Sequence, residues 1–137
     1  MIYQEKFIVS TKGRGFYPLE QQIQKIVSEK EVQTGLCHVY IPHTSASIII
    51  SENADPTVLK DLEDYMSRLV KDGDPLFQHT AEGEDDMASH IRSVLTQTFV
   101  SVPIANHALA LGVWQGIFLW EHRHLAHQRQ VLVNLLF

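Results

Sequence analysis

The chain has 137 residues, 45% of them hydrophobic, and a formal net charge of −5. This length suits one domain with a core of its own, and this composition argues against a disordered chain. No apolar run reaches the roughly 18 residues that span a bilayer, and no basic stripe suits a phosphate backbone, so neither membrane nor nucleic acid is an expected partner.

The predicted elements mix strands with about three helices. Apolar residues at helical spacing predict helices, and alternating ones predict strands. In chain order we expect a strand over 2–9, a helix over about 18–29, strands over 36–41 and 47–50, a helix from 56, a helix from 86, and strands over 98–104, 108–111, 115–121 and 129–136.

Several single residues sharpen these elements. Asp55 is a good N-cap for the second helix, and Pro56 suits its first position because the missing N–H costs nothing there. Either Asp85 or Asp86 can cap the third helix. The one cysteine, Cys37, lies in a predicted strand, so a buried structural thiol is expected, and a reducing cytoplasm suits it.

The second helix carries one apolar face. Its members are Val58, Leu62, Tyr65, Met66 and Leu69. Because the final strands follow one another closely, hairpins are expected in a mixed or largely antiparallel sheet. The predicted fold is therefore α+β, as a single domain over residues 1–137.

Polar side chains gather where strands begin and end. The run from His43 to Ser47 supplies an imidazole and three hydroxyls, although the hydroxyls of Thr44, Ser45 and Ser47 can equally satisfy local backbone groups. Glu52 and Asn53 follow the same strand. Asn53 suits a turn, whereas Glu52 has no such local duty.

Histidine is abundant, with eight residues in the chain. Asp86 and His90 are four residues apart on the third helix and can face each other. His79 lies on an acidic loop, where a lone histidine usually has no role, and a helical histidine beside a core is more often structural. His122, His124 and His127 crowd one loop, where solvent can account for them.

The strand over 115–121 places Gln115 and Glu121 on one face. Trp114 continues an aromatic stripe on the other face, which is most simply explained as packing. Arg129 begins the next strand and can pair with Glu121 across a hairpin, which would give both residues a structural explanation.

Taken in order, these segments resemble the YjbQ family, a group also called secondary thiamine-phosphate synthases. The resemblance rests on His43–Ser47, Glu52–Pro56, His79, Asp85–Ile91, Leu111–Ile117, Glu121–Arg123 and Arg129. It implies an α+β homotrimer with a metal in the pocket. The implied activity joins a pyrimidine pyrophosphate to a thiazole phosphate and releases pyrophosphate.

Three neutral imidazoles with an open position make a catalytic zinc-type site, so the predicted ligands of a divalent ion, zinc or magnesium, are His43, His79 and His90. The predicted catalytic residues are Glu52, Asn53, Asp86, Gln115 and Glu121. The predicted contacts to a small, phosphorylated substrate are Thr44, Ser45, Ser47, Trp114 and Arg129. A non-catalytic trimeric module that binds a metal or small ligand, and a metal-dependent hydrolase, remain alternatives.

Overall fold

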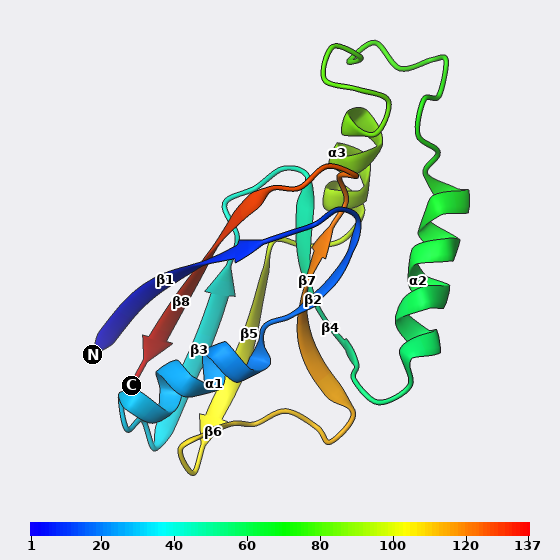
Figure 1. The fold of residues 1–137 in the computed structure, drawn as a ribbon. Coiled ribbons are helices and arrows are strands. Elements are labelled where there is room, and N and C mark those ends of the chain that lie inside the picture. Colours follow the sequence, from blue (N-terminus) through cyan, green and yellow to red (C-terminus); the bar gives the residue numbers. More distant parts are fainter.

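The computed structural model describes residues 1–137 and contains three helices and eight strands (Figure 1). The helices are α1 (Glu20–Glu29), α2 (Pro56–Leu69) and α3 (Asp86–Leu95). The strands are β1 (Ile2–Ser10), β2 (Gly15–Pro18), β3 (Thr34–Tyr40), β4 (Ala46–Glu52), β5 (Phe99–Ala105), β6 (Ala108–Leu109), β7 (Gln115–Glu121) and β8 (Gln128–Leu136). The predicted α+β class is confirmed.

Two antiparallel sheets form the body of the molecule. One has five strands in the order β1-β8-β3-β5-β6, and the other has three in the order β2-β7-β4. Every strand pair is antiparallel. The register sets Phe7 opposite Val131 in the larger sheet and Ile48 opposite Leu119 in the smaller one. The two chain ends meet at one edge of the larger sheet.

The hydrophobic core lies among the two sheets and α1. Strands β5 and β8 alternate buried and more exposed residues, so one face of the larger sheet supplies the core. The smaller sheet adds Ile48 and Leu119, and α1 adds Ile23 and Val27. Strand β7 is buried on both faces after its first residue, because α2 and α3 lie on the side away from the core (Figure 1).

Strand β2 was not predicted. The helix expected over about 18–29 starts two residues later, because Pro18 is the last residue of β2 and lies opposite Phe118 of β7. The helix begins after Leu19, whose side chain is buried and makes no cap hydrogen bond. A strand of four residues is too short for alternation to be read from sequence.

Helix α2 starts where the sequence predicts, but none of its residues is fully buried. The Asp55 carboxylate accepts a hydrogen bond from the Thr57 N–H at 2.9 Å, as expected of an N-cap. The helix nevertheless has no buried residue, and its apolar face leaves Leu62, Tyr65 and Leu69 exposed. Figure 1 shows α2 beside β4 at the edge of the molecule. The predicted apolar face is present, but within one chain most of it is exposed to solvent.

Cys37 is fully buried in β3, and burial raises the pKa of its thiol to about 12, so the structural interpretation of this cysteine is confirmed. None of the three helices has the length and apolar character that crossing a bilayer requires.

A buried ion pair joins the two sheets. Arg129 at the start of β8 donates from Nε to Glu121 at the end of β7 at 2.7 Å, and from a terminal nitrogen to the second carboxylate oxygen. Thr11 also donates to Glu121 at 2.7 Å, and Arg129 donates to Ser45 Oγ at 3.0 Å. Burial on its own raises the pKa of Glu121, but hydrogen bonds from Arg129 and Thr11 and the Arg129 charge outweigh it and lower the pKa.

We predict that Glu121→Gln lowers the free energy of unfolding by about 3–5 kcal/mol, because it leaves Arg129 as a buried charge without its counterion. Urea unfolding measures this change. Glu29→Gln is the matched control, since Glu29 forms an exposed pair with Lys25, and its effect should stay below about 0.5 kcal/mol.

The same pair predicts an acid dependence. A carboxyl group with a lowered folded-state pKa contributes stability above its unfolded pKa, about 4.3 for glutamate, and loses it as pH falls through the folded value. Wild type should therefore lose more stability than Glu121→Gln below about pH 4. Equal losses would show that Glu121 does not ionise in the folded state.

Candidate metal centre

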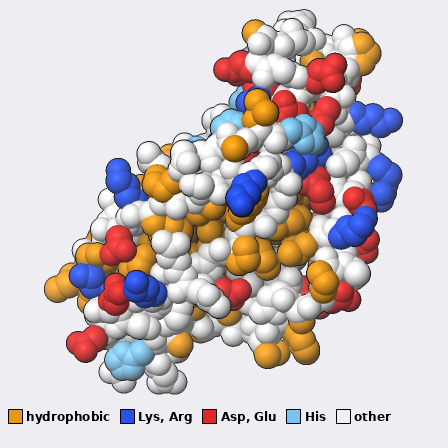
Figure 2. All heavy atoms as spheres, in the orientation of Figure 1, with side chains coloured by type: hydrophobic (Ala, Val, Ile, Leu, Met, Phe, Trp, Pro, Cys, Tyr) orange, Lys and Arg blue, Asp and Glu red, His pale blue; other side chains and the backbone are white.

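Three of the predicted residues converge at the start of α3. His79 Nε2 lies 2.7 Å from Asp86 Oδ2, and His90 Nε2 lies 3.2 Å from the same oxygen. One ligand atom from each side chain lies within 4.8 Å of the others. Asp86 and His90 are one helical turn apart on α3, and His79 comes from the preceding loop. Figure 2 shows acidic and histidine side chains gathered at this end of the molecule.

The hydrogen bonds of His90 assign its tautomer. Its Nδ1 lies 2.9 Å from the carbonyl oxygen of Thr44, which can only accept, so Nδ1 carries a hydrogen. In the neutral ring, Nε2 then carries no hydrogen, and its lone pair faces Asp86 Oδ2, which is also an acceptor. Two acceptors at 3.2 Å require a proton or a metal cation between them, and a neutral imidazole oriented by a carbonyl is the usual form of a histidine metal ligand.

Arg123 holds the carboxylate of Asp86 in this orientation. It donates to Asp86 Oδ1 at 2.8 Å and to Asp85 Oδ2 at 3.0 Å, and it also donates to the Glu82 carbonyl at 2.8 Å. Asp86 Oδ2 is therefore left for the two imidazoles. Asp85 was expected as a possible cap of α3, but its side chain makes no cap hydrogen bond because it binds Arg123 and the His124 N–H.

Asp86 is almost completely buried. Burial on its own raises the pKa of Asp86, but hydrogen bonds from neighbours including His79, together with the His90 and Arg123 charges, outweigh it and lower the pKa. The position of Asp86 in the first turn of α3 also favours a negative charge. The carboxylate is thus held ionised, as a metal ligand must be.

His43 was predicted as a ligand, but the structure does not bring it into this group. Its Nε2 accepts a hydrogen bond from the Gln130 backbone N–H at 2.8 Å. The ring lines a separate pocket of about 410 Å³ together with His90 and Thr44. Burial, and next the Arg129 charge, lower the pKa of His43. A neutral His43 therefore presents Nδ1–H as a hydrogen-bond donor.

The predicted substrate contacts Ser45, Ser47 and Arg129 are occupied inside the protein. Arg129 binds Glu121 and Ser45, so the structural alternative for the Arg129–Glu121 pair is the one observed. Ser47 is fully buried and bonds to His122 Nε2 at 2.7 Å. Thr44 lines the pocket beside His43, and its carbonyl accepts from His90, while its hydroxyl forms no hydrogen bond within the chain.

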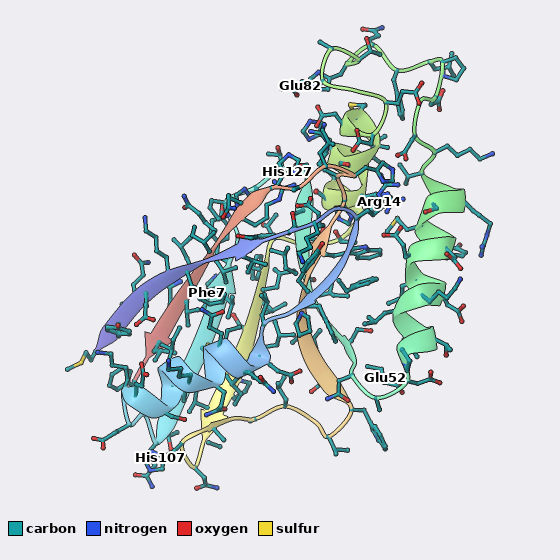
Figure 3. All side chains as sticks on the ribbon, viewed as in Figure 1. Phe7, Arg14, Glu52, Glu82, His107 and His127 are labelled. Atoms are coloured by element: carbon teal, nitrogen blue, oxygen red, sulfur yellow. The ribbon has the colours of Figure 1, made fainter.

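The other four predicted residues lie at the far end of β4 and β7. Glu52 and Gln115 face each other across these strands, and β4 spans six residue steps, or about 20 Å. Figure 3 shows Glu52 and Glu82, which lies beside the histidine group, at opposite ends of the molecule. Here Glu52 accepts from the Asp55 N–H at 3.2 Å, and Asn53 donates to the Gln115 carbonyl at 3.3 Å. Trp114 is 62% exposed, so the packing explanation for it is wrong.

Sequence reasoning missed His122, which was assigned to a solvated loop. Its side chain is fully buried against Trp120, Nδ1 has no hydrogen-bond partner, and burial together with the nearby arginines lowers its pKa to about 2. A signal was present, because His122 directly follows β7 and continues the alternate-residue spacing of Phe118 and Trp120.

The fold is that of an α+β protein of the YjbQ type, since solved proteins of that type share it. The sequence profile of the family described as "UPF0047 protein YjbQ-like" matches residues 5–137. The chain belongs to this family.

Proteins of similar sequence match this chain over nearly its whole length. The protein sll1880 of Synechocystis is 48% identical over 97% of this chain and 90% of its own length. YjbQ of Salmonella typhimurium is 40% identical, with 98% of each chain covered. A solved YjbQ/UPF0047 protein from Clostridium acetobutylicum has a TM-score of 0.88 at 30% identity and covers 96% of this chain and 99% of its own.

We predict that His122 makes the folded protein less stable in mild acid. Because the folded form excludes a proton that the unfolded chain binds below about pH 6.5, this residue costs about 1.4 kcal/mol of stability per pH unit below that value. Urea unfolding between pH 8 and 5 should give a shallower pH dependence for His122→Phe, whatever its stability at pH 8. An unchanged slope would show that His122 titrates normally.

Proposed function

We propose that the chain is a metal-dependent enzyme whose divalent ion is held by His79, Asp86 and His90. The observation that carries this proposal is the convergence of one ligand atom from each of these three side chains, all within 4.8 Å of one another. Two imidazoles and one carboxylate suit zinc, and three protein ligands leave a coordination position open for water or substrate. His79 is about half exposed, so a small ligand can reach that position.

The pocket beside His90 supports a small polar or phosphorylated ligand. Besides His43 and His90, its lining includes Thr44, Ser93 and Thr98. His43 Nδ1–H and the Thr44 hydroxyl are donors that no other group in the protein uses, and they can bind phosphate oxygens. His43 then acts as a ligand-binding residue next to the ion.

The reaction that we propose first is transfer of the thiamine-phosphate synthase type, which the family resemblance implies. A bound divalent ion would offset the charge of a pyrophosphate leaving group. His43 and Thr44 would orient the phosphate end of the substrate, and Arg123 keeps Asp86 directed at the ion site. The arginines near the site are already paired with Asp85, Asp86 and Glu121, so charge compensation depends on the ion.

Hydrolysis is a second candidate, favoured by the position of Glu82. Its carboxylate lies 3.6 Å from His79 Nε2 and is mostly exposed. A carboxylate at the rim of a zinc site can accept a proton from an attacking water. Glu82→Gln separates the two reactions, because it should abolish hydrolysis and leave synthase turnover nearly unchanged.

Zinc titration by calorimetry tests the metal site. We expect one ion per chain, and His79→Ala, Asp86→Asn or His90→Ala should each weaken binding by more than the about 10–100-fold typical of outer-shell changes. Arg123→Gln should fall within that range, because it only orients Asp86. His38→Ala on β3 is the control, and His43→Ala should keep the ion.

Folded protein that binds no zinc, manganese or magnesium would overturn the metal site. Zinc binding that survives Asp86→Asn would move the ion to other ligands. If the metal-loaded protein forms no thiamine phosphate and hydrolyses no phosphate ester, the alternative of a binding module without turnover replaces the enzyme.

We also propose the homotrimer that the resemblance implies. Two different apolar surfaces support it. One is the face of α2 with Leu62, Tyr65 and Leu69, and the other is on the larger sheet, where Leu136 lies between Ile2 and Leu36. Contacts between two unlike surfaces close into a ring of three when each copy is rotated by a third of a turn from the next.

Sedimentation equilibrium should give three times the chain mass of 15.6 kDa. Leu62→Glu combined with Leu69→Glu should yield monomers, because two charges would enter the contact. Leu76→Glu is the control, since Leu76 is exposed on the loop before α3. A monomeric wild type would refute the trimer.

A further inference from the structure

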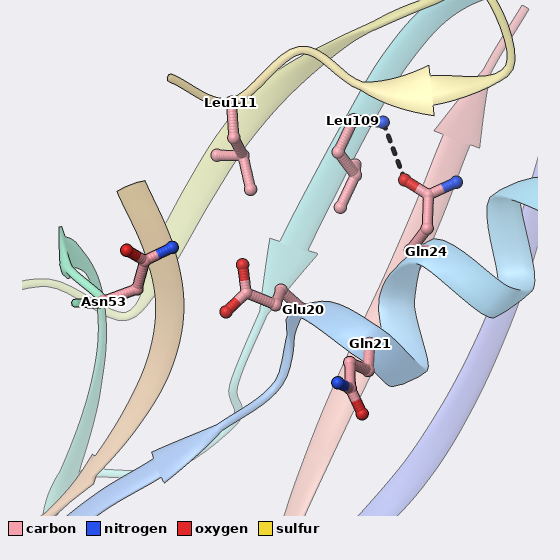
Figure 4. A pocket seen from close by; sticks show the side chains of 6 residues that line it. All are labelled: Glu20, Gln21, Gln24, Asn53, Leu109 and Leu111. Atoms are coloured by element: carbon pink, nitrogen blue, oxygen red, sulfur yellow. Dashed lines mark hydrogen bonds between the residues drawn. The ribbon is translucent and has the colours of Figure 1, made fainter. Parts of the chain in front are cut away.

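A second pocket lies at the opposite end of the molecule from the histidine group. It has a volume of about 480 Å³, within the range of small-molecule sites. Its lining comes from the first turns of α1, the residue after β4, and β6 with the segment that follows it, and consists of Glu20, Gln21, Gln24, Asn53, Leu109 and Leu111 (Figure 4). Neither the metal site nor its ligand pocket uses these residues.

The only charged side chain in this lining is Glu20. It is partly buried, it forms no hydrogen bond or ion pair within the chain, and Figure 4 shows its carboxylate between Asn53 and the leucines. Burial raises the pKa of Glu20, with no neighbouring cation to offset it. The nearest lysine on the helix, Lys25, pairs instead with Glu29. An incoming cation would therefore gain a partly desolvated carboxylate that has no competing partner.

The walls of the pocket are fixed before any ligand arrives. Gln24 accepts from the Leu109 N–H at 2.9 Å and donates to the His107 carbonyl at 3.1 Å, which ties the β5–β6 hairpin to α1. Gln115 accepts from the Gly112 N–H at 2.8 Å and so closes the next loop. A pre-formed site loses less conformational entropy when it binds a ligand.

Gly116 makes room for the polar side. A Cβ at this position would lie 3.0 Å from Glu20 Oε1 and 3.1 Å from Asn53 Cβ, closer than ordinary contacts. The glycine therefore lets Glu20 and Asn53 approach the same stretch of β7. The pocket therefore explains why a glycine occurs in the segment Trp114-Gln115-Gly116, which lies away from the histidine group.

We propose that this pocket binds a small organic cation, whose protonated amine or amidine pairs with Glu20 while its apolar frame packs on Leu109 and Leu111. One carboxylate is too few ligands for a divalent metal ion. An anion would meet Glu20 without any compensating positive side chain in the lining. The mixture of one charge, three amides and two leucines fits an amphipathic cation.

Benzylamine is a suitable probe, because it carries one ammonium group on an aromatic frame. Titration of the ¹⁵N-labelled protein should give saturable amide shifts around residues 20–24 and 109–116, with Kd on the order of 1 mM for so small a ligand. Benzyl alcohol has the same shape without the charge and should bind at least about tenfold more weakly.

Two variants test separately the contribution of the Glu20 charge and that of the apolar contact with Leu111. Glu20→Gln should weaken benzylamine binding at least about tenfold, and Leu111→Ala, which keeps the carboxylate, should weaken it several-fold. Glu29→Gln on the same helix should bind as wild type does. The amide spectrum of each free variant shows whether it is folded.

Unchanged binding by folded Glu20→Gln would overturn the proposal. Shifts centred on the acidic residues 82–86, or no saturable shift at tens of millimolar benzylamine, would overturn it as well. Asp86→Asn should keep benzylamine binding, so the organic-cation pocket and the metal site can fail independently.

Discussion

The buried pair of Arg129 and Glu121 is the constraint on which the rest of the molecule depends. It joins the last residue of β7 to the second residue of β8 and so fixes how the smaller sheet meets the larger one. Thr11 and Ser45 are bonded to the same pair. The carbonyl of Thr44 is consequently held where His90 can donate to it, and the chain that leaves Glu121 passes through His122 to Arg123. One ion pair thus positions both the Thr44 carbonyl, which orients His90, and Arg123, which orients Asp86.

The antiparallel pairing of β4 with β7 explains why the polar motifs form two groups. Both strands carry polar residues near each end and apolar residues between them. The antiparallel register places the start of β4 beside the end of β7, and the end of β4 beside the start of β7. Ser47 and His122 therefore lie near the histidine group, while Asn53 and Gln115 lie near Glu20. A long apolar sheet separates the groups, and each group has its own rigid frame. The chain accordingly offers two separate polar sites on one small domain.

The sequence predicts the strands and helices well where periodicity or a cap is strong. Alternation gives β5 and β8, and Asp55 gives the start of α2. It fails where the partner is distant, as for β2 and for Asp85, which binds Arg123 38 residues away. In the candidate metal site, the helical spacing predicts the Asp86–His90 contact. The approach of His79 and the separate position of His43 depend on loop geometry, which no local pattern records.

Charge accounts for what each site can attract. Arg123 and Arg129 are already paired with Asp85, Asp86 and Glu121, so neither arginine offsets the negative charge on the rest of a chain whose net charge is −5. An exposed acidic loop surrounds the histidine group, and Glu20 stands alone in its pocket. This charge pattern favours cations at both places, as the two proposals require: a metal ion at the first and an organic cation at the second. A phosphorylated ligand, by contrast, would be repelled until a cation is present. We therefore infer that metal binding precedes the binding of any anionic substrate.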